Sequence, residues 1–102
     1  MASYFVTRHP GAIEWACRQG IVATMLSHLD PGRVETGDTV LGVLPVHIVA
    51  AINAKGARYL HLELDMAEED RGRELSAGDL DRLGARLIEY RARRVENTKE
   101  TA

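Results

Sequence analysis

Short apolar runs alternate with helix-like segments along the first third of the chain. Tyr4-Phe5-Val6 is a compact apolar run that predicts a buried strand. Pro10 lacks a backbone N–H and fits the first turn of a helix, and Gly20 is a natural stop for that helix. The apolar residues between 21 and 29 predict a second strand, although part of this segment also fits a helix.

The next segment repeats the order of strand, proline and helix. Residues 39–43 form a β-rich run that predicts a third strand, and Pro45 opens a helix that residues 55–56 close. Residues 58–64 alternate, which predicts a fourth strand with two different faces. The apolar face holds Leu60, Leu62 and Leu64, and the other holds Tyr59, His61 and Glu63. We expect this second face to meet water or a polar interface.

A charged connection and a last helix complete the predicted elements. Residues 65–74 are too polar to form a core element. Ser76 and Asp79 resemble a capping box with Asp in place of Glu. The helix that starts there is predicted to place Leu80, Leu83, Leu87 and Tyr90 on one stripe. Residues 95–102 form a polar tail that we expect to fray, so the predicted domain is a single one over residues 1–94.

The order βαββαβα predicts a small α/β domain with a parallel or mostly parallel sheet and helices on both faces. In such sheets, ligands bind beyond the carboxyl ends of the strands, where the strand order reverses. If strands one and three are neighbours, the loops at residues 7–11 and 44–47 line that crevice. Both loops lead into a helix N-terminus, where free N–H groups and the helix dipole favour an anion.

The chemistry of these two loops suits a phosphate or phosphodiester better than a metal ion. The first loop is Thr7-Arg8-His9-Pro10-Gly11, and the second is Leu44-Pro45-Val46-His47. Each carries a histidine, and the first adds an arginine. Arg71-Gly72-Arg73-Glu74 is a doubly cationic segment that is either a lid over an anionic ligand or a solvated turn. The plain alternatives for the loops are a surface arginine and ordinary loop histidines.

Composition and net charge reduce the classes of ligand and partner that this protein is expected to bind. The 102 residues are 45% hydrophobic and 27% charged, the balance of a soluble globular protein. The net charge of −2 disfavours the wide basic face that long nucleic acid requires. Four histidines without metal-ligand spacing and a lone Cys17 lead us to expect no metal site, no disulfide and no cofactor. No apolar stretch could span a bilayer and no secretory signal is visible, so we expect a cytoplasmic protein without a membrane partner.

Several motifs resemble a family of small ancillary proteins of type III CRISPR systems, the Csx-sixteen family. The most specific is the run Arg8-His9-Pro10-Gly11-Ala12-Ile13-Glu14-Trp15, within a similar segment that starts at Tyr4. The others, in the same order as in the family, are Gly37-Asp38-Thr39-Val40 with Leu44-Pro45-Val46, Gly56-Ala57-Arg58-Tyr59 and Arg71-Gly72-Arg73-Glu74-Leu75-Ser76. Together they cover the chain from Tyr4 to about Tyr90.

The resemblance implies a Rossmann-like (CARF-like) fold, a homodimer and a ring nuclease activity without a metal. Such an enzyme opens cyclic tetra-adenylate, the second messenger of type III CRISPR immunity, and switches the response off. The matched motifs and the loop positions together give the candidate site. The candidate catalytic residues are His9, Arg8 and His47, where His47 rests on its position alone because it lies outside the matched motif. The candidate ligand-binding residues are Thr7, Pro10, Gly11, Leu44, Pro45, Val46, Arg71 and Arg73.

Two other functions remain compatible with the sequence. The same pocket could sequester the cyclic nucleotide without cutting it, because binding and slow cleavage need the same anion cradle. Alternatively, the chain is a structural dimer that docks on another CRISPR component through the charged segment 65–74. A protein that sequesters the ring saturates at a fixed ratio of ring to protein, whereas an enzyme turns over. A structural dimer would have no affinity for the nucleotide.

Overall fold

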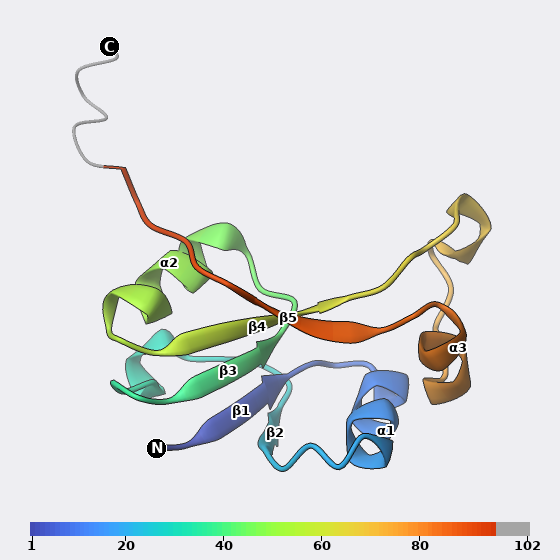
Figure 1. Ribbon diagram of the computed structural model, residues 1–102, viewed down its shortest axis with the longest axis horizontal. Coiled ribbons are helices and arrows are strands. Elements are labelled where there is room, and N and C mark those ends of the chain that lie inside the picture. The colour runs from blue at the N-terminus through green and yellow to red at the C-terminus, as the bar shows by residue number, and fades with distance from the viewer. Residues whose placement is uncertain (96–102) are drawn as a thin grey trace.

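A computed structural model describes residues 1–95, which form one five-stranded sheet and three helices (Figure 1). The strands are β1 (Ser3–Val6), β2 (Thr24–Leu26), β3 (Thr39–Gly42), β4 (Arg58–Glu63) and β5 (Arg86–Tyr90), in the order β2-β1-β3-β4-β5. The first four strands are parallel, and β5 runs antiparallel to β4. The helices are α1 (Pro10–Arg18), α2 (Val46–Ala54) and α3 (Ala77–Arg82).

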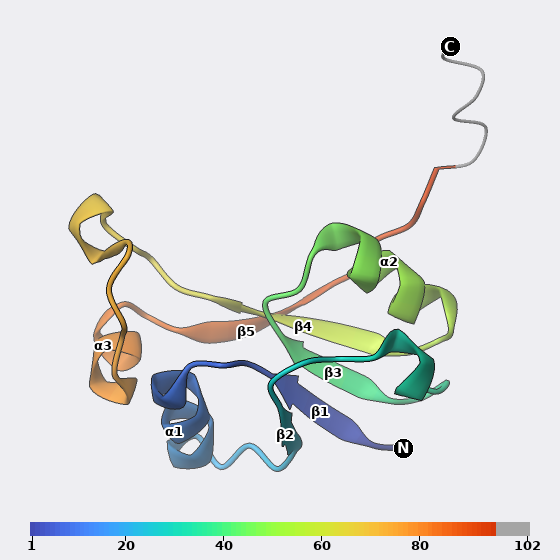
Figure 2. The ribbon, with the colours of Figure 1, turned by 180° about the vertical axis from the view of Figure 1, so that it is seen from behind.

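The helices cover both faces of the sheet, as predicted. Helices α1 and α3 lie side by side at one end of the molecule, whereas α2 packs on the opposite face (Figure 2). Successive residues of β1 and β3 alternate between the two cores: Tyr4 and Val40 pack on the α2 side, and Phe5 and Leu41 pack on the side of α1 and α3. The indole of Trp15 joins α1 to α3, because its Nε1 donates a hydrogen bond to Asp81 Oδ1 at 3.1 Å.

The strand order reverses between β1 and β3. From β1 the chain crosses through α1 to β2 on one side, and from β3 it crosses through α2 to β4 on the other. The crevice between the carboxyl ends of β1 and β3 is therefore a topological switch point. The predicted α/β class, the mostly parallel sheet and the neighbouring positions of strands one and three are confirmed.

The predicted last helix is wrong beyond residue 82. Helix α3 ends at Arg82, and Gly84 has a φ of 73° that a side chain would disfavour. The Ala85 N–H donates to the Leu80 carbonyl and the Gly84 N–H to the Asp81 carbonyl, which is the Schellman pattern of a helix end. The chain then returns as β5 along the edge of β4.

The residues predicted to continue the helical stripe lie instead in this antiparallel pair, where Leu87 faces Leu62 and Tyr90 faces Tyr59. The element order is consequently βαββαβαβ, with one strand more than expected. The predicted tail at 95–102 lies, beyond Val95, outside the described residues.

Candidate functional site

The loop after β1 holds Arg8 and His9 at the switch point. Thr7 extends the strand pairing because its N–H donates to the Leu26 carbonyl at 2.8 Å. The Thr7 hydroxyl accepts the His9 N–H at 3.1 Å, and the Arg8 Nε donates to the Ser27 carbonyl at 3.4 Å. Arg8 and His9 are both exposed. The loop backbone is thus fixed by local hydrogen bonds, while the imidazole of His9 makes no capping bond and is free for a ligand.

A cavity of about 680 Å³ opens at this loop. Its walls bring together residues from four places in the chain: the loop after β1, the end of β3, the segment after β2 and the connection before α3. They include Thr7, Arg8, His9, Ser27, Gly42, Val43 and Arg73 over an apolar floor that contains Phe5, Leu62 and Leu80. Four predicted site residues (Thr7, Arg8, His9 and Arg73) therefore line one cavity.

Arg73 is already engaged by two carboxylates. Its guanidinium donates to Asp70 Oδ1 at 2.9 Å and to Asp79 Oδ2 at 3.2 Å. The hydrogen bond from Arg73 holds the pKa of Asp70 below its usual value. The Arg73 side chain remains 44% exposed, so it presents partly neutralised positive charge to the cavity from a fixed position.

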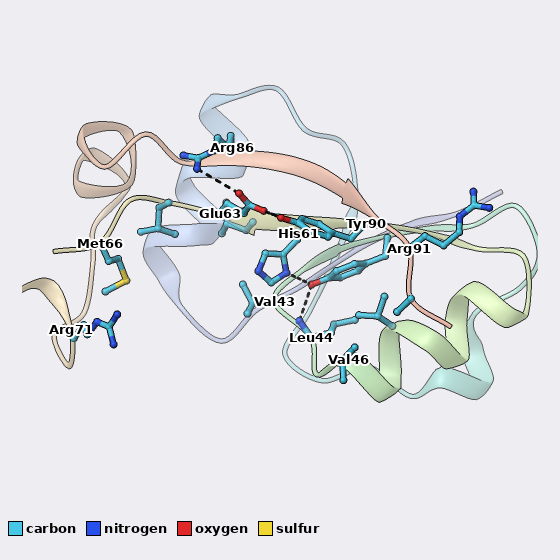
Figure 3. A pocket seen from close by; sticks show the side chains of 15 residues that line it. Val43, Leu44, Val46, His61, Glu63, Met66, Arg71, Arg86, Tyr90 and Arg91 are labelled. Carbon is cyan, nitrogen blue, oxygen red and sulfur yellow. Dashed lines mark hydrogen bonds and ion pairs between the residues drawn. The ribbon is translucent and has the colours of Figure 1, made fainter. Parts of the chain in front are cut away.

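Figure 3 shows a second cavity, with a volume of about 820 Å³. The two cavities share Val43, Leu62, Leu64 and Met66 in their walls. The predicted residues Leu44, Val46 and Arg71 line the second cavity and not the first. The structure thus places seven of the eleven predicted site residues around two adjoining cavities at the carboxyl ends of β1, β3 and β4.

Four predicted residues line neither of these two cavities: Pro10, Gly11, Pro45 and His47. Pro10 begins α1 and Pro45 is the N-cap of α2, as the sequence indicated. Gly11 is buried against the backbone of Leu75. His47 is exposed in the first turn of α2, and its proposed role stays a prediction.

Sequence reasoning missed two residues of the second cavity, Tyr59 and His61. Tyr59 is 1% exposed, so the expectation of a polar face along β4 holds only toward the carboxyl end of the strand. The Tyr59 hydroxyl accepts the Leu44 N–H at 2.9 Å and donates to the Gly42 carbonyl at 3.0 Å. Its oxygen also lies 2.6 Å from Nδ1 of His61. The sequence did contain one indication of this wall, because the alternation of residues 58–64 places Tyr59, His61 and Glu63 on one face of the strand.

Beside His61, a chain of polar contacts between β4 and β5 continues the same wall of this cavity. The Tyr90 hydroxyl donates to Glu63, and this hydrogen bond raises the pKa of Tyr90 above its usual value. The Arg86 guanidinium nitrogen Nη2 lies 3.5 Å from Glu63 Oε2 and 3.3 Å from Asp65 Oδ1. With Arg71 and Arg91 also in the lining, the second cavity carries three guanidinium groups and one carboxylate. An anionic ligand fits this balance.

Within residues 1–95, no three His, Cys, Asp or Glu side chains come together as a metal-binding group. No helix in the same range has the length and apolar character needed to cross a bilayer.

The structure is that of an α/β protein with two adjoining, partly polar cavities at its topological switch point. Residues 4–93 match the model of a family described as "Putative CRISPR-associated protein (Cas_VVA1548)", so the chain belongs to this CRISPR-associated family. No curated protein and no solved structure matches the chain. The family match confirms the expected association with CRISPR systems. The narrower assignment to the Csx-sixteen family stays a prediction.

Proposed function

We propose that this protein is a metal-independent ring nuclease that binds and opens cyclic tetra-adenylate and so ends type III CRISPR signalling. The observation that carries the proposal is the cavity at the switch point, where Arg8, His9 and Arg73 gather from separate segments. Membership in a CRISPR-associated family and the motifs shared with the Csx-sixteen family support the choice of ligand. The adjoining cavity, with three further guanidinium groups, supports a ligand that carries several phosphates.

The proposed reaction uses the ribose 2′-hydroxyl as the nucleophile. Attack of the 2′-oxygen forms a new O–P bond, breaks the P–O5′ bond and leaves a 2′,3′-cyclic phosphate and a 5′-hydroxyl. Alignment of the 2′-oxygen with the departing 5′-oxygen supplies several kcal/mol of the barrier. Arg8 stabilises the additional negative charge of the transition state. His9 transfers a proton, a role typically worth about 10²–10⁴-fold in rate.

A homodimer suits the shape of this ligand. Cyclic tetra-adenylate has four phosphates and approximate fourfold symmetry, so a twofold pair of chains presents equivalent sites to opposite sides of the ring. Isologous dimers are also the commonest oligomers. In this arrangement each chain contributes its own pair of cavities, and the two switch points together surround one ring.

The experiment that tests the site compares His9→Ala and Arg8→Ala with matched variants outside both cavities. His28 is an exposed histidine, and Arg18 is an exposed arginine of α1 paired with Glu14. Single-turnover cleavage of radiolabelled cyclic tetra-adenylate should fall by about 10²-fold or more in His9→Ala. Cleavage by Arg8→Ala should fall as well, together with affinity for the ring. His28→Ala and Arg18→Ala should behave as wild type.

The proposed site is wrong if both cavity variants bind and cleave the ring at the wild-type rate. Ring that is retained intact in a fixed ratio to the wild-type protein would instead indicate sequestration. An absence of any affinity for the ring would favour an interaction protein that docks through residues 65–74.

A further inference from the structure

The Tyr59 hydroxyl settles which nitrogen of His61 carries the proton in the neutral ring. A tyrosine hydroxyl has one proton to donate and two lone pairs to accept with. The Leu44 N–H can only donate to this oxygen, and the Gly42 carbonyl, 3.0 Å away, can only accept from it. If the hydroxyl proton pointed at His61 instead, the Gly42 and Tyr59 oxygens would face each other without a proton between them.

All three contacts become hydrogen bonds in one arrangement only. The Tyr59 O–H donates to Gly42, and His61 donates its Nδ1–H to the Tyr59 oxygen across 2.6 Å. Nε2 of the neutral imidazole is then an acceptor, and Nε2 of the imidazolium is a donor. Because the bond at Nδ1 is the same in both forms, the ring can take up and release a proton at Nε2 without turning.

The His61 ring is held in place from both sides. Its plane meets the ring of Tyr59 edge-on, with centroids 5.7 Å apart, and the ring of Tyr90 edge-on at 5.6 Å. Figure 3 shows the edge opposite Tyr59 turned toward the part of the cavity where Met66 and Arg71 lie. His61 is half-buried and lines the cavity, which leaves it accessible to a ligand there.

Opening a phosphodiester by 2′-attack requires two proton transfers. One proton leaves the 2′-hydroxyl, and one is delivered to the 5′-oxygen as the P–O5′ bond breaks, so no other reactant is consumed. We propose that Nε2 of His61 carries one of these transfers and that Tyr59 is its positioning residue; this inference rests on the proposed ring nuclease function.

Charged and titratable groups of several segments line the same cavity as His61. They are Tyr59 and Glu63 of β4, Arg86 and Tyr90 of β5, Arg91 after β5, and Arg71 of the connection before α3. The arginines favour an anionic phosphodiester in this cavity, and Glu63 is occupied by Tyr90 and Arg86. Among the described residues that line this cavity, His61 is the one histidine. If it transfers a proton, its replacement should remove the corresponding limb of the pH–rate profile.

The first test measures single-turnover cleavage of cyclic tetra-adenylate between pH 5 and 9. His61→Ala and the size-matched His61→Gln should lose about 10²-fold or more in rate and lose one limb of the pH profile. Ring binding by isothermal titration calorimetry should remain within a few-fold of wild type. His28→Ala is the matched control and should cleave normally. Tyr59→Phe should cleave more slowly with a displaced pH profile, whereas its binding should stay near the wild-type value.

The second test needs no nucleotide. In long-range ¹H–¹⁵N NMR spectra of the free protein recorded up to pH 9, we expect the neutral His61 ring to carry its proton on Nδ1. Tyr59→Phe should shift the population toward the Nε2–H form. An Nε2–H tautomer in the wild-type protein would overturn the assignment, whether or not the protein cleaves the ring.

Failure of this inference differs from failure of the proposed function. If the wild-type protein cleaves the ring and both His61 variants cleave equally well, His61 has no proton-transfer role while the ring nuclease stands. If the wild-type protein does not cleave the ring, both proposals fall.

Discussion

Gly11 shows how tightly single residues set the position of the candidate site. A Cβ at this position would lie 2.0 Å from the carbonyl oxygen of Leu75, in the backbone that leads into α3. The absence of a side chain therefore lets the first turn of α1 contact the Leu75 backbone directly. This contact holds the loop that carries Arg8 and His9 close to the connection that carries Arg73.

We predict that Gly11→Ala lowers the free energy of unfolding by about 1–3 kcal/mol, because the backbone on both sides must move apart. The control is Gly78→Ala in α3, where an added Cβ meets only Ser76 Oγ, at 3.8 Å. That substitution should raise stability by about 0.5–1 kcal/mol. Urea denaturation of the two variants measures both effects, and equal changes in the midpoint would contradict the close approach.

The three candidate catalytic residues Arg8, His9 and His61 were not equally easy to identify from the sequence. Arg8 and His9 were predictable because they follow a strand and precede a helix-starting proline, which places them at the carboxyl edge of the sheet. His61 was not predictable as a site residue. Its orientation depends on Tyr59, whose hydroxyl is fixed by the backbone of Gly42 and Leu44, and that contact exists only once β3 pairs with β4.

At the scale of elements, α3 is the helix most dependent on its ends, since it has only six residues. The Ser76 hydroxyl accepts the Asp79 N–H at 3.1 Å, and Asp79 accepts the Ser76 N–H at 3.0 Å. This capping box was predictable from the spacing. Asp79 also pairs with Arg73 and Arg82. The helix start and the guanidinium of the first cavity are therefore held by the same carboxylate.

The Asp79 carboxylate should make α3 sensitive to acid. The Ser76 N–H, assisted by Arg73 and Arg82, lowers the pKa of Asp79 from 3.8 to about 2. A lowered pKa in the folded state means that the ionised form stabilises the fold above pH 4, and that this contribution is lost as pH falls toward 2. Asp79→Asn should therefore reduce the melting temperature at pH 7, and the difference from wild type should shrink by pH 2.5.

The control for this experiment is Glu69→Gln, which removes a negative charge from an exposed position. It should change the melting temperature little at either pH. A difference between Asp79→Asn and wild type that is the same at pH 7 and pH 2.5 would contradict the assigned role of Asp79.

The last strand illustrates where local pattern was insufficient. The spacing of Leu80, Leu83, Leu87 and Tyr90 fits a helical stripe, but the same chain ends its helix at Gly84 and pairs with β4. The deciding factors are a glycine with positive φ and the open edge of β4, which offers backbone hydrogen bonds along five paired residues. Only the first of these is visible in the sequence, and the second depends on the order of all the strands.

At the scale of the whole molecule, the switch point follows from topology. Two crossover units that leave a central pair of strands in opposite directions place β1 beside β3, so the position of the first cavity was predictable. The second cavity was not, because its wall includes β5 and the connection that carries Met66 and Arg71. The charged connection contributes lining residues to both cavities, so part of it is not a purely solvated turn.

The most direct test of the ring nuclease proposal is product analysis under multiple turnover. The purified protein is incubated with a tenfold molar excess of cyclic tetra-adenylate, with and without EDTA, and the products are resolved by liquid chromatography and mass spectrometry. We predict complete conversion to linear products that end in a 2′,3′-cyclic phosphate, at the same rate in both conditions. Ring that stays intact, either bound in a fixed ratio to protein or free in solution, would contradict the proposed function.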